Sequence, residues 1–362
     1  MKKALSVFLC LLLFASVLSV GVSAAETGAS GSFTAFCYNV AGLPDISAIT
    51  GEESRDVPAN QTDIGNYVSA QKYDIFAAQE DFGYHDNLAA ALPAYQYQTF
   101  HHGIVPFGDG TNTFTRSFPM YNEQHIVWNR LYGVVDDGAD EFSQKGITYT
   151  VIEIAEGVYL DFYNIHADAY GDPGSVAART DNFRQLADLI NNRAVDRPVI
   201  VTGDFNAFVF NDSSRLKEIL VDGCGLKDAW VETKNNGNYD DCSEFTARFP
   251  GGWQEKWGVW DSVERFMYKD GAGVSLSCDS FAYVQVLNRS GKSASDHNAA
   301  LAGFTYTVTG DVPTGELKVT DTGFVAKIKE TFRRIVVFFR KLMFGLQNLD
   351  KVKAYFDKGG EG

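Results

Sequence analysis

The sequence lacks several patterns that would point to common protein classes. No two of its five cysteines have the C-x-x-C spacing that is typical of zinc sites. No short-period repeat is visible, and the region between the two termini has no dense cluster of Lys and Arg. Near the C-terminus, charges interrupt every apolar run well short of the ~20 residues that a membrane-spanning helix needs. A cysteine-based zinc domain, a repeat protein and a C-terminal membrane span are therefore disfavoured.

The charge that is present is mostly negative and unevenly spread. The whole chain carries a formal charge of −15, whereas its last fifty residues are net basic. The central region is therefore more acidic than the whole chain. Tight, non-specific binding of a polyanion requires clustered Lys and Arg. The excess of negative charge in the central region therefore disfavours a nucleic-acid partner.

The N-terminus has the three parts of a signal peptide. Lys2 and Lys3 precede a short apolar core, and small residues follow at Val22–Ala25. This pattern predicts residues 1–25 as a Sec signal peptide and the mature protein as secreted or associated with the cell surface, of bacterial type. A membrane anchor is the weaker alternative, because the apolar core is short.

Four cysteines follow this segment, and outside the cytosol they are able to pair. Cys37 lies in a strand-like run and is expected to be a buried thiol. Cys224 and Cys242 flank a loop and are the best candidates for a disulfide, although the pairing of Cys278 leaves alternatives open.

Strand-like runs of the chain end in polar residues that bind metals or transfer protons. Asn39, Glu80, His166 and Asp204 with Asn206 stand at four such ends, and Asp296 and His297 precede the run 299–308. Strands of a layered α/β sheet bring their carboxyl ends to one rim, so these residues are expected to converge. Their oxygen and imidazole groups suit a hard divalent cation, Mg²⁺ or Mn²⁺, beside two proton-transfer groups.

This chemistry predicts the hydrolysis of a phosphate ester. Glu80 is the natural metal ligand, and Asn39 is a neutral oxygen donor. Asp296 is expected to orient His297, which takes a proton from water. Asp204 is expected to hold that water or a second metal, and Asn206 to bind a phosphoryl oxygen. The expected metal ligands are Asn39, Glu80, Asp204 and Asp296.

The same residues lie in motifs that resemble a known family. YNVAGLP, AQED, NIHADA, VTGDFNA and SDHNAA resemble the endonuclease/exonuclease/phosphatase superfamily, which includes deoxyribonuclease I and the bacterial sphingomyelinases C. The resemblance covers about residues 32 to 308 and implies a four-layer α/β/β/α sandwich, as does the alternation of strands and helices. It also implies that His166 is steadied by an acidic residue in the run 263–266, where Glu264 stands in place of the usual Asp.

The C-terminal part is expected to form separate segments. After a catalytic domain at 26–308 and a linker at 309–323, residues 324–362 predict a basic amphipathic helical tail that either binds a membrane surface or docks on the acidic domain. Trp253, Trp257 and Trp260 either touch lipid or pack over a sheet edge.

The sequence therefore predicts a secreted, metal-dependent phosphodiesterase, expected to be a monomer. The substrate is expected to be a phospholipid head group, as for a sphingomyelinase or phospholipase C. The alternatives are a nuclease resembling deoxyribonuclease I and a catalytically silent binding module that retains the fold.

Overall fold

The computed structural model describes residues 25–45, 54–105, 108–133, 140–141, 143–210, 213–243 and 262–319, with residues 332, 336 and 339. Residues 1–24 of the predicted signal peptide, the three tryptophans of residues 253–260 and most of the predicted tail lie outside these residues. Among the described residues, no helix has both the length and the apolar character needed to cross a membrane.

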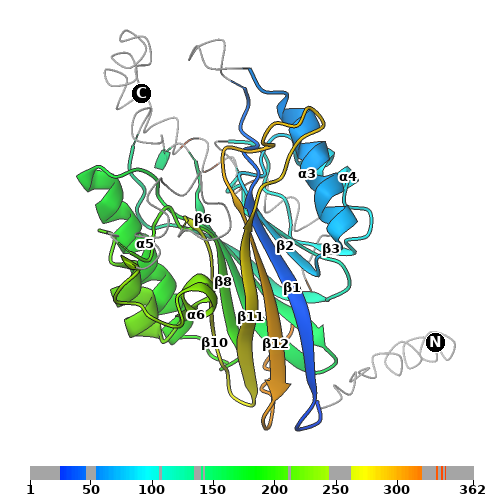
Figure 1. Cartoon of the computed structure of the whole chain (residues 1–362), viewed down its shortest axis with the longest axis vertical. Coiled ribbons are helices and arrows are strands. Elements are labelled where there is room, and N and C mark those ends of the chain that lie inside the picture. The colour runs from blue at the N-terminus through cyan, green and yellow to red at the C-terminus, as the bar shows by residue number, and fades with distance from the viewer. Residues whose placement is uncertain are drawn as a thin grey trace, which may run out of the picture.

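Two six-stranded mixed sheets face each other (Figure 1). The first sheet has the order β11-β12-β1-β2-β4-β3, and the second has the order β5-β6-β7-β8-β10-β9. The strands of the first sheet are β11 (Val274–Val284), β12 (Ala299–Val308), β1 (Ser30–Asn39), β2 (Ile75–Gln79), β4 (Asn112–Thr115) and β3 (Tyr97–Gln98). Those of the second are β5 (Met120–Val127), β6 (Gly146–Ala155), β7 (Val158–His166), β8 (Val199–Asp204), β10 (Glu264–Lys269) and β9 (Lys227–Asp228).

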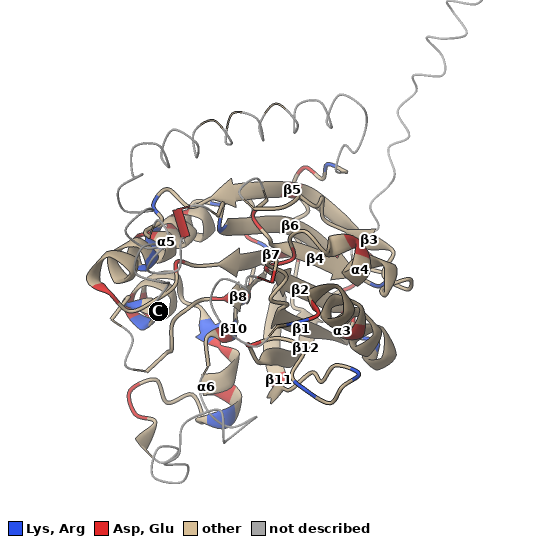
Figure 2. Cartoon of the chain, turned by 90° about the horizontal axis from the view of Figure 1, so that it is seen from above, with Lys and Arg blue, Asp and Glu red and all other residues tan. Residues whose placement is uncertain are grey.

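Helices cover the outer faces of both sheets, which confirms the predicted four-layer sandwich (Figure 2). The helices α3 (Val57–Gln71) and α4 (His85–Ala90) lie outside the first sheet. The helices α5 (Pro173–Asn191) and α6 (Ala229–Lys234), with a π-helical turn η2 at Lys217–Asp222, lie outside the second. A proline in the first turn and an aspartate cap begin both α3 and α5, because Asp56 and Asp172 accept bonds from otherwise unpaired backbone N–H groups.

The side chains of β1 illustrate how the core is divided. Phe33, Ala35 and Cys37 belong to the core that includes the facing sheet, whereas Phe36 and Tyr38 pack with α3 and α4. Successive side chains of a strand point to opposite faces of the sheet, and here the facing sheet covers one face and helices cover the other, so both sets of side chains are buried. β7 is buried along its whole length for the same reason.

No disulfide joins Cys224 and Cys242 among the described residues, so this predicted pairing is wrong. Cys224 is buried, and its thiol lies 3.5 Å from the carbonyl oxygen of Ile219, whereas Cys242 is only partly buried. The prediction of a buried thiol at Cys37 is confirmed, since this side chain has no exposed surface.

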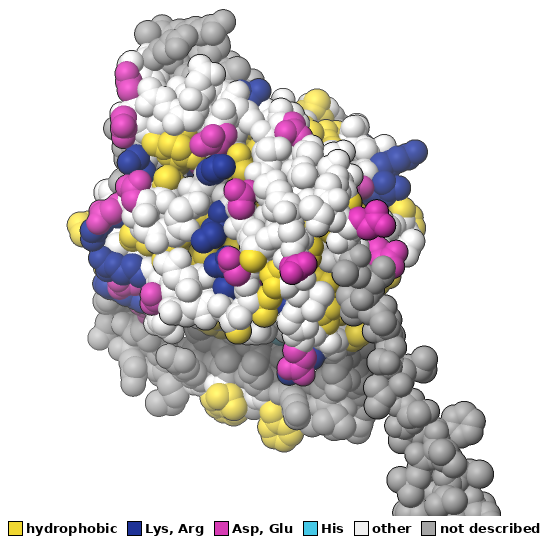
Figure 3. Space-filling view, turned by 90° about the horizontal axis from the view of Figure 1, so that it is seen from below, with side chains coloured by type: hydrophobic (Ala, Val, Ile, Leu, Met, Phe, Trp, Pro, Cys, Tyr) yellow, Lys and Arg dark blue, Asp and Glu magenta, His cyan; other side chains and the backbone are white. Residues whose placement is uncertain are grey.

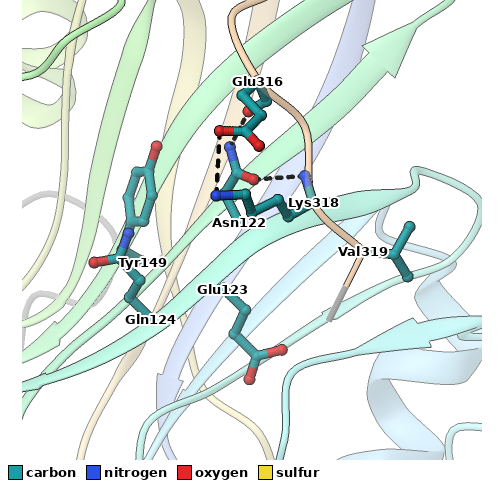
Figure 4. A pocket seen from close by; sticks show the side chains of 7 residues that line it. All are labelled: Asn122, Glu123, Gln124, Tyr149, Glu316, Lys318 and Val319. Atoms are coloured by element: carbon teal, nitrogen blue, oxygen red, sulfur yellow. Dashed lines mark hydrogen bonds and ion pairs between the residues drawn. The ribbon is translucent and has the colours of Figure 1, made fainter. Parts of the chain in front are cut away.

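The chain after β12 returns across the edge strand β5. The N–H of Asn122 donates to the carbonyl oxygen of Lys318 at 2.8 Å, and the side chain of Asn122 bonds the backbone of Glu316 and Lys318 at 2.7 Å (Figure 4). Asn122 has a positive φ of 56° at an irregularity in the β5–β6 register, which indicates a β-bulge. The returning segment thus covers part of an exposed sheet edge.

The two parallel strand pairs determine where the polar strand ends meet. In the first sheet Asn39 of β1 lies beside Gln79 of β2, and in the second His166 of β7 lies beside Asp204 of β8. β10 runs antiparallel to β8, with Glu264 opposite Asp204. Residues from five strands are therefore brought to one rim, which Figure 2 views from above.

Gly203 gives a direct test of this arrangement. Its φ is +143°, and an added Cβ would overlap the backbone carbonyl oxygen of Ile165 on β7. We expect Gly203→Ala to lower the free energy of unfolding by about 3 kcal/mol or more, because both backbone strain and a steric clash result. Gly171 has open space around it, so Gly171→Ala is the matched control. Equal denaturant midpoints for the two variants would contradict the packing described here.

Candidate active site

The side-chain amide of Asn39 lies at the centre of the convergent residues. Its Nδ2 is 3.0 Å from Glu80 Oε1 and 3.1 Å from Asp204 Oδ2, and 3.3 Å from His297 Nε2. Its Oδ1 accepts a bond from the N–H of Ala41 at 3.0 Å. Asn39 and Glu80 come from the first sheet and Asp204 from the second, so one amide joins the two sheets at the rim.

The backbone at Glu80 is held in an uncommon conformation. Glu80 has a φ of +55°, and its carbonyl oxygen accepts bonds from the N–H groups of Gly42 at 3.1 Å and Phe82 at 3.0 Å. A Cβ at Gly42 would overlap that carbonyl oxygen, so only glycine fits beside it. Such strain persists where surrounding contacts enforce it, and here it turns the Glu80 side chain toward Asn39.

His297 is bound by Glu264. His297 Nδ1 lies 2.5 Å from Glu264 Oε1, and the hydroxyl of Ser262 donates to Glu264 Oε2 at 2.8 Å. Burial opposes the charged imidazole, but the carboxylates of Glu264 and Asp204 outweigh it and raise the pKa of His297 well above its ordinary value. Glu264 therefore both orients the ring and stabilises its protonated form.

His166 has the opposite electrostatic environment. Its Nε2 lies 3.5 Å from Asp204 Oδ2, and the ring has almost no exposed surface. Burial, and then the positive charge of Lys145, lower the pKa of His166 well below its ordinary value. Two histidines at one site are thus driven toward different protonation states, which is typical of acid–base catalysis.

Two of the predicted pairings are wrong. Glu264 contacts His297 rather than His166, and Asp204 is the carboxylate beside His166. Asp296 does not orient His297: its side chain is 69% exposed, and it lies 3.9 Å from Arg55. Asp296 and His297 lie in a bend before β12, with the His297 ring on Glu264 and the Asp296 side chain in solvent. Sequence spacing gives no information on which histidine faces the strand of Glu264.

Asn206 lies beside the site. Its backbone N–H donates to Asp204 Oδ1 at 2.9 Å, and its side-chain Nδ2 donates to the carbonyl oxygen of Ala167 at 3.0 Å. It has a positive φ of 49°, which an asparagine tolerates better than most residues. In this arrangement Asn206 fixes the Asp204 carboxylate, while its predicted contact with a phosphoryl oxygen stays a prediction.

Sequence reasoning missed Lys145. This buried side chain is ion-paired with Asp140 at 2.5 Å, and its charge acts on Asp204, Glu80 and His166. Although burial lowers its pKa, Asp140 and the nearby carboxylates raise it overall, so Lys145 is a cation. A signal was available: β6 runs antiparallel to β7, so its first residues lie at the rim where β7 ends.

The donor set fits a divalent metal ion. Two carboxylates, Glu80 and Asp204, converge on one amide group, and their oxygens are the ligands that Mg²⁺ prefers. Burial raises the pKa of Glu80, which reflects the cost of a buried negative charge that a cation would remove. Asp204, Glu264 and His297 also form a group with ligand atoms within 4.8 Å of one another.

Comparisons with known proteins agree with this geometry. The model of the Endonuclease/Exonuclease/phosphatase family matches residues 36–268. A sphingomyelinase of Mycobacterium tuberculosis is 31% identical over 287 residues, covering 76% of this chain and 53% of that protein. The chain therefore spans about half the length of this relative.

Solved structures show the same fold. Beta toxin from Staphylococcus aureus, as a mutant with bound magnesium ions, has a TM-score of 0.52 and 16% identity, covering 75% of this chain and 99% of that one. D. rerio TDP2 complexed with single strand DNA product has a TM-score of 0.53 and 16% identity, covering 76% of this chain and 99% of that one.

The contact between Glu264 and His297 predicts a measurable pKa difference. In metal-free protein we expect NMR titration to show that Glu264→Gln lowers the pKa of His297 toward its ordinary value of about 6.5. A raised folded-state pKa stabilises the protein below the ordinary value, and this stability is lost as pH rises through the raised pKa. The difference in the free energy of unfolding between wild type and Glu264→Gln should therefore shrink as the pH rises through the raised pKa of His297. Glu218→Gln, at an exposed residue, is the control; an unchanged His297 titration in Glu264→Gln would refute the pairing.

Proposed function

The chain belongs to the endonuclease/exonuclease/phosphatase family, and from this premise we propose that it is a metal-dependent phosphodiesterase acting on phospholipid head groups. The observation that carries the proposal is the convergence of Asn39, Glu80, Asp204 and His297 on one point, with His166 beside them. The name of the M. tuberculosis relative, sphingomyelinase, supports the lipid substrate.

Each residue has a role in this proposal. Glu80 and Asp204, which the Asn39 Nδ2 orients, would hold the cation, Mg²⁺ or Mn²⁺, which neutralises charge on the phosphoryl oxygens when bound. The charge of a bound cation would oppose the proton that the buried carboxylates hold on His297, so that Nε2 could take a proton from the attacking water while Glu264 at Nδ1 stabilises the resulting imidazolium. His166, neutral and buried, hydrogen-bonds a phosphoryl or leaving-group oxygen. Asn206 fixes Asp204 through its backbone N–H.

Lys145 supports this machinery electrostatically. Its ammonium group lies among Asp140, Asp204 and Glu80, so it offsets the repulsion between buried carboxylates. It also keeps His166 neutral. We propose that Lys145 acts through these groups rather than on the substrate, because Asp140 holds its Nζ at 2.5 Å.

A nuclease is the second candidate, supported by the fold shared with TDP2, which was solved with a DNA product. The distribution of charge argues against it. The chain carries a formal charge of −15, and phosphate backbones are bound by clustered cations, so its overall charge suits a nucleic acid poorly. On the face away from the rim, Figure 3 shows Lys and Arg interspersed with Asp and Glu among the described residues.

We also propose that residues 324–362 contact a membrane surface. The three described residues of this tail, Phe332, Val336 and Phe339, are helical and have exposed fractions of 66%, 65% and 57%. Their spacing of four and three residues places them on one helix face. Basic residues flank them in the sequence, which suits an anionic lipid surface.

The remaining parts of the proposal concern the organisation of the chain. We assign residues 1–25 to a signal for secretion, 26–308 to the catalytic domain, 309–323 to a linker and 324–362 to the tail. Extracellular or cell-surface location would give the enzyme access to lipid head groups.

The metal requirement is tested by one substitution and one chelator. Glu80→Gln should lower phosphodiesterase turnover by at least about 10³-fold and leave the melting temperature nearly unchanged, because a charged ligand is lost without a change of shape. EDTA should abolish the wild-type activity, and Mg²⁺ should restore it. Glu218→Gln, on the surface, is the control. Full activity in EDTA would rule out the metal mechanism.

The substrate is tested with four compounds in parallel. Purified protein with Mg²⁺ should hydrolyse sphingomyelin or phosphatidylcholine vesicles and leave plasmid DNA and inositol phosphates nearly intact, with His297→Ala as the inactive blank. Robust plasmid cleavage without lipid hydrolysis would favour the nuclease instead.

The tail is tested by changing its apolar face alone. Replacing Phe332, Val336 and Phe339 by Ser should reduce hydrolysis in anionic vesicles at least several-fold while leaving a soluble phosphodiester unaffected, because burial of apolar area contributes about 25 cal/mol per Å². Removal of residues 324–362 should act in the same direction. Unchanged vesicle activity in both variants would exclude a membrane role for the tail.

A further inference from the structure

A second group of metal-binding side chains lies outside the catalytic site. His102, Asp109 and His125 each offer a ligand atom, and these atoms lie within 4.8 Å of one another. None of these residues belongs to the catalytic group Asp204, Glu264 and His297. The rings of His102 and His125 have centroids 3.6 Å apart, and the side chains of Asp109 and His125 are only 6% and 8% exposed.

His125 is held between two carboxylates. Its Nδ1 is 2.6 Å from Asp109 Oδ2, and its Nε2 is 2.9 Å from Glu123 Oε1. The Glu123 side chain is 6% exposed. A histidine that binds a metal through one nitrogen commonly donates its other N–H to a carboxylate, which fixes the ring. Around His125, Asp109 lies at Nδ1 beside the proposed metal, and Glu123 lies at Nε2, where it would accept the other N–H.

The local backbone builds this cluster. The bulge at Asn122 precedes Glu123 and His125, which are two residues apart and share one face of β5. Figure 4 shows the Glu123 carboxylate turned away from Asn122 and Glu316. On the other side, the N–H of Thr111 donates to Asp109 Oδ1 at 3.1 Å and orients that carboxylate.

We propose that His102, Asp109 and His125 bind a divalent cation of the zinc class, with Glu123 orienting His125. Two imidazoles and a carboxylate are ligands that zinc and related transition metals prefer, whereas Mg²⁺ prefers oxygen alone. The two nearly buried carboxylates, Asp109 and Glu123, carry a negative charge that a divalent cation would neutralise. Tetrahedral zinc–nitrogen bonds of about 2.0 Å place ligand atoms about 3.3 Å apart, which small side-chain adjustments here permit.

The cation would join the two sheets beside the catalytic rim. His125 belongs to β5 of the second sheet, whereas His102 and Asp109 lie between β3 and β4 of the first. The next residue, Gly110, accepts a bond from the N–H of Asp81 at 3.0 Å, directly after Glu80. A metal held at Asp109 therefore fixes the backbone that positions Glu80, and its role is structural.

A metal-free alternative makes a different prediction. Burial opposes the charged form of His125, but Asp109 and Glu123 raise the pKa of His125 to about 9. A protonated His125 would bridge the two carboxylates without any cation. In that case His102 would add no affinity for a metal, so the two interpretations differ at His102.

In the test, Co²⁺ and Zn²⁺ are added to full-length protein from which a chelator has removed bound metal ions. The Glu80→Gln/His297→Asn double variant weakens the catalytic group, so the remaining Co²⁺ absorption in the visible range reports the second site. We expect the double variant to bind one Co²⁺ ion, which Zn²⁺ displaces and excess Mg²⁺ does not. In the same background, His102→Gln should weaken this binding at least 100-fold and Glu123→Gln about 10–100-fold.

Two controls separate ligand loss from misfolding. His102→Gln keeps the contacts of His125 with Asp109 and Glu123 but loses the ring contacts of His102 with His125 and Phe100, so its own metal-free melting temperature is the baseline for the shift on adding Zn²⁺. Zn²⁺ should raise the melting temperature of the parent but not that of His102→Gln, because only a bound cation stabilises the fold. His85→Gln, which changes a neighbouring histidine cluster, should keep full Co²⁺ binding. Absence of Co²⁺ binding in the double variant, or its persistence in His102→Gln, would overturn the proposal.

Discussion

The hydrogen bonds of the Asn39 amide hold the rim together. One NH₂ group reaches Glu80 from its own sheet and Asp204 from the facing sheet, at 3.0 and 3.1 Å. This is possible only because β1 and β2, and likewise β7 and β8, run parallel and end at the same level. A shift of one residue in either register would turn these side chains to the opposite face. The position of every other group at the rim follows from this contact.

The electrostatics of the rim follow from the same packing. Asp204 and Glu264 are almost fully buried and Glu80 is partly buried, which is costly unless positive charge compensates these carboxylates. Lys145 and the protonated form of His297 supply part of that charge from within the chain. A bound cation would supply the rest. The proposed second cation site repeats this principle at the edge of the sandwich, where His125 lies between Asp109 and Glu123.

Much of the fold was predictable because its signals are local. Alternating or continuous apolar runs identified the longer strands of both sheets, and Ala299–Val308 has the predicted boundaries, whereas the short strands β3, β4 and β9 were not predicted. The apolar spacing of the sequence predicts a helix from Ala178 to Ala194, whereas helix α5 begins at Pro173, because the Asp172 cap and the proline extend it. The candidate site residues were also visible as polar groups at strand ends, which is where the chain leaves its buried core.

The sequence by itself determined which elements form and which polar residues stand at their ends, because these depend on neighbours along the chain. Only the tertiary structure decided the partners. Glu264 lies on His297 because β10 is antiparallel to β8, and Asp296 faces solvent while its neighbour faces the rim. Cys224 and Cys242 do not form the predicted disulfide, and Lys145 enters the site from the start of β6. Contacts between strands remote in sequence follow from register and sheet order, which local patterns do not encode.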